Sequence, residues 1–284
     1  MTQEAAKFTG SIPTYYDEEL GPVIFIQYAE DIAARAKSLN PSNVLEMAAG
    51  TGIVSRALRD ALPKSTDILS TDLNEAMLDV ARTKFKDGER IDFRSMDAMS
   101  IPHADDTYDM ILSQFGVMFF PDKVASYREA LRVLKPGGTY LLNVWGSWDE
   151  CPWAPTVHNA VAAFFRGDPP GFYKVPFHYS DTKQLQRDFA AAGFTDIEIE
   201  KVKSNGPVAS HEAFATGAIM GNPVSEEIKA QPGNVETETV RNEVAKALEK
   251  KFGAAPTTMP LVAYVITAKK PSPKKGLFAR VFGS

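Results

Sequence analysis

The chain has 284 residues, of which 44% are apolar, and a formal net charge of −5. This balance indicates a sizeable core and argues against a general nucleic-acid binder, which would carry a basic surplus. The single cysteine, Cys151, excludes an internal disulfide and a cysteine-based metal cluster. The sequence shows no signal peptide and no apolar run long enough to span a bilayer, so we expect a cytoplasmic protein without a metal site.

Strand and helix patterns alternate along the first half of the chain. A polar segment over residues 1–22 precedes a helix over 23–37, and a strand then ends in the glycine turn at 48–52. The elements expected next are helices over 53–62, 74–85 and 124–134 and strands over 68–72, 91–97, 108–113 and 139–144. This alternation predicts a parallel sheet with helices on both faces.

The pattern becomes irregular after Trp145. Residues 146–180 are dense in proline and glycine and are interpreted as a lid with one helix near 157–165. We then expect a helix over 181–192, a strand over 197–202, mainly helix over 210–252 and a last strand over 260–268. The whole of 1–268 is interpreted as a single domain. Its parts are a flap and helix (1–40), a cofactor-binding core (41–145) and substrate-side lid insertions (146–180 and 204–258), followed by a flexible basic tail (269–284).

The functional interpretation depends on the stretch from Val44 to Gly52. A strand that stops at Gly-x-Gly and opens a helix builds a ligand crevice at the carboxyl edge of a parallel sheet. A dinucleotide site would have glycine where this chain has Ser55, and Glu46 would repel a pyrophosphate. The same carboxylate suits a cationic ligand such as S-adenosylmethionine, which carries a sulfonium and an ammonium.

Acidic residues lie in or at the ends of three successive strands: Glu46, Asp72 and Asp97. A carboxylate at Asp72 matches a ribose diol, which either kind of cofactor would present. Asp97 and the backbone N–H of Ala98 could bind the edge of an adenine. Each acid alone is more simply a solvated strand end or a helix cap, but the ordered set favours a nucleoside site.

These motifs, in this order, resemble the class I S-adenosylmethionine-dependent methyltransferases. They are most similar to the small-molecule branch that includes the ubiquinone and menaquinone biosynthesis C-methyltransferases. The resemblance is carried by Val44–Gly52, Asp72, Met96–Ala98, Tyr108–Ile111 and Leu134–Gly138. It implies an α/β, Rossmann-like fold with a seven-stranded, mostly parallel sheet, an antiparallel last strand at 260–268 and helical lid insertions. It also implies S-adenosylmethionine as the cofactor and S-adenosylhomocysteine as the product.

The resemblance further implies roles for individual residues in binding the cofactor. The turn would face the methionine part and the ribose. The ends of the second and third strands would face the adenine, and a residue just past the fourth strand would face the methionine end. The residues are Glu46, Ala48, Gly50 and Gly52 of the turn, then Asp72, Leu73, Met77, Asp97, Ala98 and Gln114. Tyr16 is expected to belong to a flap over the cofactor.

The acceptor is less closely specified. Methyl transfer from a sulfonium needs orientation and exclusion of water, and a base only when the acceptor must lose a proton. His178 is the candidate base, because in relatives the segment at Pro176–Phe177 approaches the acceptor; a packed or solvent-facing histidine is the simpler alternative. Aromatic residues near the crevice mouth, beyond those needed for the core, indicate a small apolar or aromatic acceptor.

We therefore expect methyl transfer to an O, N or C atom of a small acceptor. The alternatives are C-methylation of a quinone-like ring and a module that holds the cofactor without transferring its methyl. Glu46 and Ser55 argue against a dinucleotide oxidoreductase. A homodimer is compatible with the sequence, and no nucleic-acid partner is expected. The basic tail could touch an anionic membrane, although a disordered tail or a docking arm for another subunit is the simpler interpretation.

Overall fold

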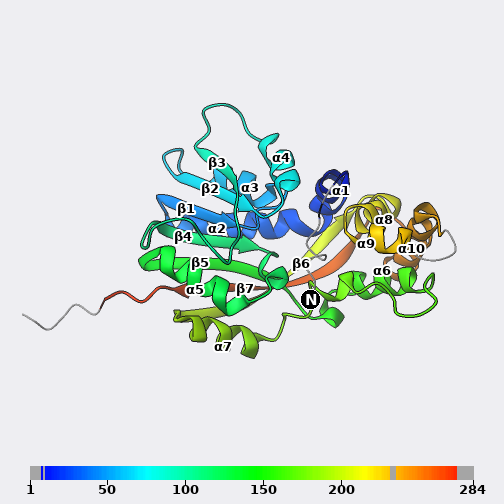
Figure 1. The fold of residues 1–284 in the computed structure, drawn as a ribbon. Coiled ribbons are helices and arrows are strands. Elements are labelled where there is room, and N and C mark those ends of the chain that lie inside the picture. The colour runs from blue at the N-terminus through cyan, green and yellow to red at the C-terminus, as the bar shows by residue number, and fades with distance from the viewer. Residues whose placement is uncertain (1–7, 9, 231–234, 274–284) are drawn as a thin grey trace, which may run out of the picture.

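The computed structural model describes residues 8, 10–230 and 235–273. Seven strands form one sheet in the order β3-β2-β1-β4-β5-β7-β6 (Figure 1). Their bounds are β1 Asn43–Met47, β2 Asp67–Asp72, β3 Ile91–Ser95, β4 Tyr108–Gln114, β5 Leu134–Trp145, β6 Thr195–Val208 and β7 Thr257–Lys269. The pairs from β3 to β5 are parallel, and β7 is antiparallel to both β5 and β6. The expected sheet, with its antiparallel last strand, is confirmed.

Helices of three kinds surround this sheet. The α-helices are α1 Ile12–Tyr15, α2 Ile26–Leu39, α3 Ile53–Ala61, α4 Glu75–Arg82, α5 Lys123–Val133, α6 Trp153–Ala162, α7 Thr182–Ala192, α8 His211–Met220, α9 Val224–Lys229 and α10 Thr237–Phe252. A π-helix, η2, spans Tyr16–Phe25, and short 3₁₀ turns are η3 Val117–Phe119, η4 Trp148–Glu150 and η5 Phe172–Lys174. None of the described helices has both the length and the apolar character that crossing a membrane requires.

The central strands are buried on both faces because helices cover each side. Val44 and Met110 pack with Ile32 of α2 and Leu58 of α3 in one cluster. Their neighbours in the strands, such as Leu45 and Ile111, belong to a second cluster that includes side chains of α5 and α7. Successive strand residues point to opposite faces, and both faces are dry, so these strands are nearly continuous apolar runs.

A long ribbon of β6 and β7 extends the sheet beyond the end of β5. β5 pairs with β7 only over residues 263–269, whereas β6 pairs with β7 over 257–269. The ribbon therefore continues past Trp145, the last residue of β5, and α6, α8, α9 and α10 gather at that end (Figure 1). This arrangement places the lid elements beside the carboxyl ends of the parallel strands, where ligands bind in such sheets.

Several expected boundaries were wrong. The lid helix is 153–162 rather than 157–165, because Pro152 and Pro155 fall at the N-cap and in the first turn, where proline is tolerated. β6 and β7 are both longer than expected, so 195–196, 203–208, 257–259 and 269 also lie in strands. Pairing along the whole ribbon decides this, and it is not visible in the local sequence. The tail from 274 onward lies outside the described residues.

The N-terminal segment is helical from Ile12, although the sequence predicted a helix only from residue 23. η2 packs against α8, and the approach is close enough to require glycine on that helix. A Cβ at Gly217 would lie 2.7 Å from the Cβ of Glu19, and one at Gly221 would lie 2.8 Å from the backbone N of Tyr16. The contact with α8 therefore positions this segment, and residues 12–22 themselves carry no signal of it.

Candidate active site

The turn after β1 brings its backbone close to α4. Ala48, Gly50 and Gly52 all have positive φ, at 54°, 56° and 78°. The Ala49 N–H donates to the Thr71 carbonyl at 2.8 Å, which ties the turn to β2. A Cβ at Gly52 would lie 2.7 Å from the Cβ of Ala81, so glycine is needed there both for its φ and for space.

Glu46 lies beneath the turn and is 1% exposed. Its Oε2 accepts hydrogen bonds from Ser55 Oγ at 2.5 Å and Ser70 Oγ at 2.6 Å. Burial raises the pKa of this carboxyl to about 7, against the lowering effect of the two hydroxyl donors. The carboxyl thus joins α3 to β2 and, near neutral pH, is poised between its charged and neutral forms.

The carboxylate of Asp72, at the end of β2, accepts hydrogen bonds from the turn after β1 and from the segment after β2. Its Oδ2 accepts from the Gly50 N–H and its Oδ1 from the Asn74 N–H, both at 2.9 Å. Burial raises the pKa of Asp72, while these backbone donors act in the opposite direction. The Leu73 N–H and the Asn74 side chain also donate to this carboxylate, so the protein itself supplies about as many donors as the carboxylate has acceptor positions, and a ribose diol would have to share them.

Four other residues expected to bind the nucleoside follow β2 and β3. Leu73 is 64% exposed, which is unusual for a large apolar side chain, whereas Met77 of α4 is buried. Asp97 is exposed and its Oδ1 accepts from the Met99 N–H at 2.8 Å, so it shapes its own turn. Ala98 packs against the edge of the core. An uncovered Leu73 beside Asp72 is the feature here that suits a flat base.

η2 lies across the crevice. Burial raises the pKa of Tyr16, and the nearby carboxylates of Asp72 and Asp17 raise it further. The Tyr16 ring stacks on Phe25 with centroids 4.8 Å apart. Asp17 forms an ion pair with Lys84, which follows α4, so η2 is tied to the opposite wall of the crevice. A role for this segment as a flap over the cofactor stays a prediction.

Gln114 at the end of β4 connects three elements. Its Nε2 donates to the Phe25 carbonyl at 3.1 Å, and its Oε1 accepts from Asn143 Nδ2 at 3.2 Å. Asn143 Oδ1 in turn accepts from the Phe115 N–H at 3.0 Å. Gln114 therefore fixes the end of η2 against β4 and β5, a role that was not foreseen because Asn143 carries no motif of its own.

Two buried hydroxyls at this edge have no hydrogen-bond partner among the residues that the structure describes. They are Thr51 Oγ1, in the turn, and Ser113 Oγ, in β4. A Cβ at Gly116 would lie 2.5 Å from the Cβ of Ala48 and 2.8 Å from Ser113 Oγ, so the turn and the end of β4 are in close contact. Buried polar groups are normally satisfied, and the carboxylate and ammonium of a methionine moiety would offer partners. The residues present thus fit S-adenosylmethionine.

Aromatic side chains fill the space beyond β4 and β5. Phe115 and Trp145 stack with centroids 3.8 Å apart and an interplanar angle of 3°. Trp145 also contacts Trp153 of α6 and Phe177, with centroids 6.3 and 6.1 Å away. We call Phe115, Trp145, Trp148, Trp153 and Phe177 the aromatic cluster. It links the cofactor edge of the sheet to the lid.

His178, the candidate base, is exposed next to this cluster in sequence. Its Nδ1 contacts the Val175 carbonyl and its ring lies 6.4 Å from that of Tyr179. It is the neighbouring Phe177 that is buried in the aromatic cluster. A role for His178 as a base stays a prediction. Within the described residues, no group of three or more His, Cys, Asp or Glu side chains is arranged to hold a metal ion.

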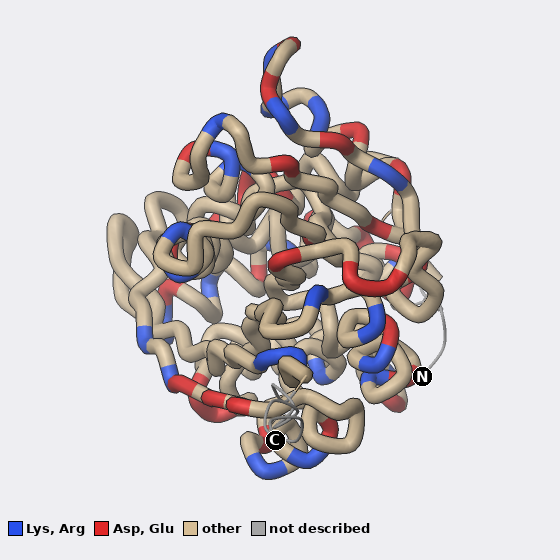
Figure 2. The backbone as a smooth tube through the Cα atoms, turned by 90° about the vertical axis from the view of Figure 1, so that its left-hand side faces the viewer, with Lys and Arg blue, Asp and Glu red and all other residues tan. Residues whose placement is uncertain are grey.

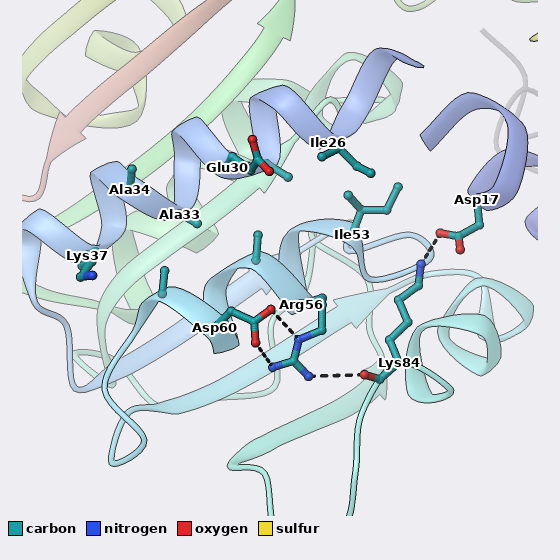
Figure 3. Close-up of a pocket in the computed structure, with 13 residues that line it drawn as sticks. Asp17, Ile26, Glu30, Ala33, Ala34, Lys37, Ile53, Arg56, Asp60 and Lys84 are labelled. Carbon is teal, nitrogen blue, oxygen red and sulfur yellow. Dashed lines mark hydrogen bonds and ion pairs between the residues drawn. The ribbon is translucent and has the colours of Figure 1, made fainter. Parts of the chain in front are cut away.

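A separate groove of about 610 Å³ opens between α2 and α3 (Figure 3). Alanines of the two helices line it, and its rim carries the Arg56–Asp60 ion pair. Asp17 and Lys84 stand at one end of it. Because helix side chains rather than the loops after the strands line this groove, we do not assign the cofactor or the acceptor to it.

Comparison with known proteins agrees with this geometry. The model of the ubiE/COQ5 methyltransferase family matches residues 15–158. Demethylmenaquinone methyltransferase of Staphylococcus saprophyticus is 28% identical over 61% of this chain and 78% of its own. Methyltransferase ktnA of Aspergillus niger is 28% identical over 80% of this chain and 84% of its own.

A solved structure shows the same fold. Phosphoethanolamine N-methyltransferase 2 of Haemonchus contortus, in complex with phosphomonomethylethanolamine and S-adenosylhomocysteine, matches with a TM-score of 0.53 at 17% identity. The match covers 93% of this chain and 61% of that one. At this identity the similarity extends to the fold alone.

Proposed function

The chain belongs to the ubiE/COQ5 methyltransferase family and uses S-adenosylmethionine, and from this premise we propose that it methylates a small, flat, apolar acceptor. S-adenosylmethionine supplies a methyl group already activated on a sulfonium. The chain therefore has to bind the two substrates, align the acceptor with the methyl carbon and keep water out. A quinol-type ring is the first candidate acceptor, since demethylmenaquinone methyltransferases are among the relatives.

The cofactor would lie on the turn after β1. In this proposal Asp72 accepts from the ribose hydroxyls, Leu73 and Met77 flank the adenine, and Asp97 with the Ala98 N–H binds its edge. The methionine end would lie on the backbone of Ala48, Gly50 and Gly52, with Thr51 and Ser113 offering their free hydroxyls. Glu46 supports the turn from beneath, while Tyr16 and Gln114 belong to the flap and its base.

One observation carries the proposal for the acceptor: the parallel stack of Phe115 on Trp145 at the carboxyl ends of β4 and β5. Phe115 follows Gln114 directly, so the stack borders the expected methionine end of the cofactor site. Flat aromatic surfaces in a water-poor site bind flat apolar rings well. Basic and acidic residues are interspersed along the described chain in Figure 2, which agrees with a small-molecule acceptor better than with a nucleic acid.

Transfer of a radiolabelled methyl group tests this function. We expect the protein to convert S-adenosylmethionine to S-adenosylhomocysteine with naphthoquinols or phenols and to label the organic product. Phosphoethanolamine and glycine serve as polar comparison acceptors. Labelling of the polar acceptors alone would refute the apolar site. Tight cofactor binding without any transfer would instead favour a protein that holds the cofactor for another purpose.

A further inference from the structure

The aromatic cluster and the histidine beside it, His158, contain two buried polar atoms that lack partners among the described residues. Trp153 and His158, both on α6, are 5% and 6% exposed. Trp153 Nε1 and His158 Nδ1 are among the buried side-chain atoms of the described residues for which no hydrogen-bond partner is found. An unsatisfied polar atom in a dry site costs about 1–3 kcal/mol, so each of these two nitrogens would gain from a ligand that supplies a hydrogen-bond partner.

Both side chains join the same cluster. The Trp153 ring lies 5.7 Å from that of Phe177, the Trp148 ring lies 5.5 Å from Phe177, and His158 lies 5.5 Å from Trp148. Trp153 is also the member of α6 that contacts Trp145, at the end of β5. A continuous series of ring contacts thus leads from the Phe115–Trp145 stack, beside the cofactor turn, to these two nitrogens.

The chemistry of the two nitrogens is complementary. The indole N–H of tryptophan is only a donor. Burial, and then the nearby cation of Lys174, lower the pKa of His158, which favours the neutral ring with one unprotonated nitrogen. A neutral histidine can accept a hydrogen bond, and a hydroxyl group can accept from the indole while it donates to the imidazole.

We propose that Trp153 and His158 bind a hydroxyl group on the ring of the acceptor and so select hydroxylated aromatic acceptors over their hydroxyl-free or methoxylated counterparts. This inference rests on the proposed function. It assigns specificity to α6 rather than to His178, whose ring is exposed. The aromatic cluster supplies the apolar surface for the ring, and the two nitrogens fix its orientation.

The test is calorimetric measurement of the binding of 1-naphthol and of 1-methylnaphthalene, whose methyl group can neither donate nor accept, in the presence of S-adenosylhomocysteine. The wild-type protein should prefer 1-naphthol about five- to tenfold, which corresponds to one or two hydrogen bonds. Trp153→Phe and His158→Phe keep an aromatic ring and should each lose part of this preference, with little change for 1-methylnaphthalene. His158→Asn, which keeps a polar group near the position of Nδ1, should restore part of it. His103→Phe is the matched control and should behave like the wild type, because His103 contacts Tyr108 at the start of β4, at the opposite end of the strand from the aromatic cluster.

The outcomes separate the two levels of the proposal. Binding of S-adenosylhomocysteine, measured alone for each variant, reports both folding and the cofactor site. If the wild type does not bind it, the proposed function fails. If it binds, but the wild type shows no preference for 1-naphthol or the two phenylalanine variants retain the preference, only the assignment of Trp153 and His158 is overturned.

Discussion

The hydroxyl of Ser55 donates a 2.5 Å hydrogen bond to the buried carboxyl of Glu46. Ser55 occupies the position where a dinucleotide-binding turn has its third glycine, and that glycine normally serves close packing of helix on strand. Here the Ser55 side chain has a different role, because its hydroxyl donates a hydrogen bond to the Glu46 carboxyl at the end of β1. Glu46 and Ser55, the two residues that argue against a dinucleotide, are therefore hydrogen-bonded to each other, and Ser70 of β2 donates to the same carboxyl.

The first prediction concerns the stability of the protein as a function of pH. Burial raises the pKa of Glu46 from 4.5 to about 7. Between these values the unfolded chain has lost the proton that the folded chain keeps, so the free energy of unfolding should fall as pH rises. The loss is at most about 3 kcal/mol by pH 7.5. Glu46→Gln should remove this contribution, which urea unfolding at pH 4.5 and 7.5 would measure.

A matched control for that experiment is Glu200→Gln. The hydrogen bond from Arg35 lowers the pKa of Glu200, so its small contribution to stability has the opposite pH dependence. If wild type and Glu46→Gln lose the same stability over this range, Glu46 does not keep its proton in the folded state.

The second prediction concerns the two hydroxyl donors. Ser55→Ala and Ser70→Ala each remove one hydrogen bond to a buried carboxyl and should destabilise the protein by about 1–3 kcal/mol at pH 8. In the background of Glu46→Gln the cost should be smaller, because the acceptor is no longer charged. A double-mutant cycle from chemical denaturation measures this difference, and strict additivity would show that the serines do not act through Glu46.

The third prediction concerns Gly52. Gly52→Ala places a Cβ 2.7 Å from that of Ala81 at a φ of 78°, so strain and overlap add. Gly88→Ala is the control, because Gly88 has a φ of 87° and a Cβ placed there would meet no atom of the described residues within 4 Å. We expect about 1 kcal/mol of destabilisation at Gly88 and at least twice that at Gly52. Thermal unfolding of the two variants compares them, and Ala81→Gly should partly rescue Gly52→Ala. Equal losses would mean that the turn and α4 can move apart.

The fourth prediction concerns the flap. The Asp17–Lys84 ion pair ties η2 to the segment after α4, and both side chains are largely buried, at 18% and 22% exposed. Lys84→Met should let the flap open more often and accelerate dissociation of S-adenosylhomocysteine several-fold, since a partly buried ion pair contributes on the order of 1 kcal/mol. Stopped-flow displacement measures this rate.

The exchanged pair Asp17→Lys with Lys84→Asp provides the complementary test. It should bring the dissociation rate back toward that of the wild type, because the attraction is restored with its sign reversed. An unchanged rate in Lys84→Met would show that the ion pair does not limit exit of the ligand.

The sequence by itself determined the sheet and the class of cofactor. Alternation of apolar strands with helices specifies parallel pairing. Each helix brings the chain back to the end of the sheet at which the previous strand began, so the next strand runs in the same direction. The acids Glu46, Asp72 and Asp97 could be placed at one edge from strand ends alone. These signals are local, since a strand and the turn after it depend mainly on residues that are close in the chain.

Only the tertiary structure decided what covers that edge. The helix from Ile12 depends on glycines of α8 some 200 residues away in the sequence, and the ribbon beyond Trp145 depends on pairing between β6 and β7. The same is true of the contact between Trp153 and Trp145, which joins the lid to the sheet. Such contacts arise from packing between distant segments and leave no periodic pattern in either one. The residues that would meet the acceptor are therefore brought together by the fold, whereas those that would hold the cofactor follow the strands in order.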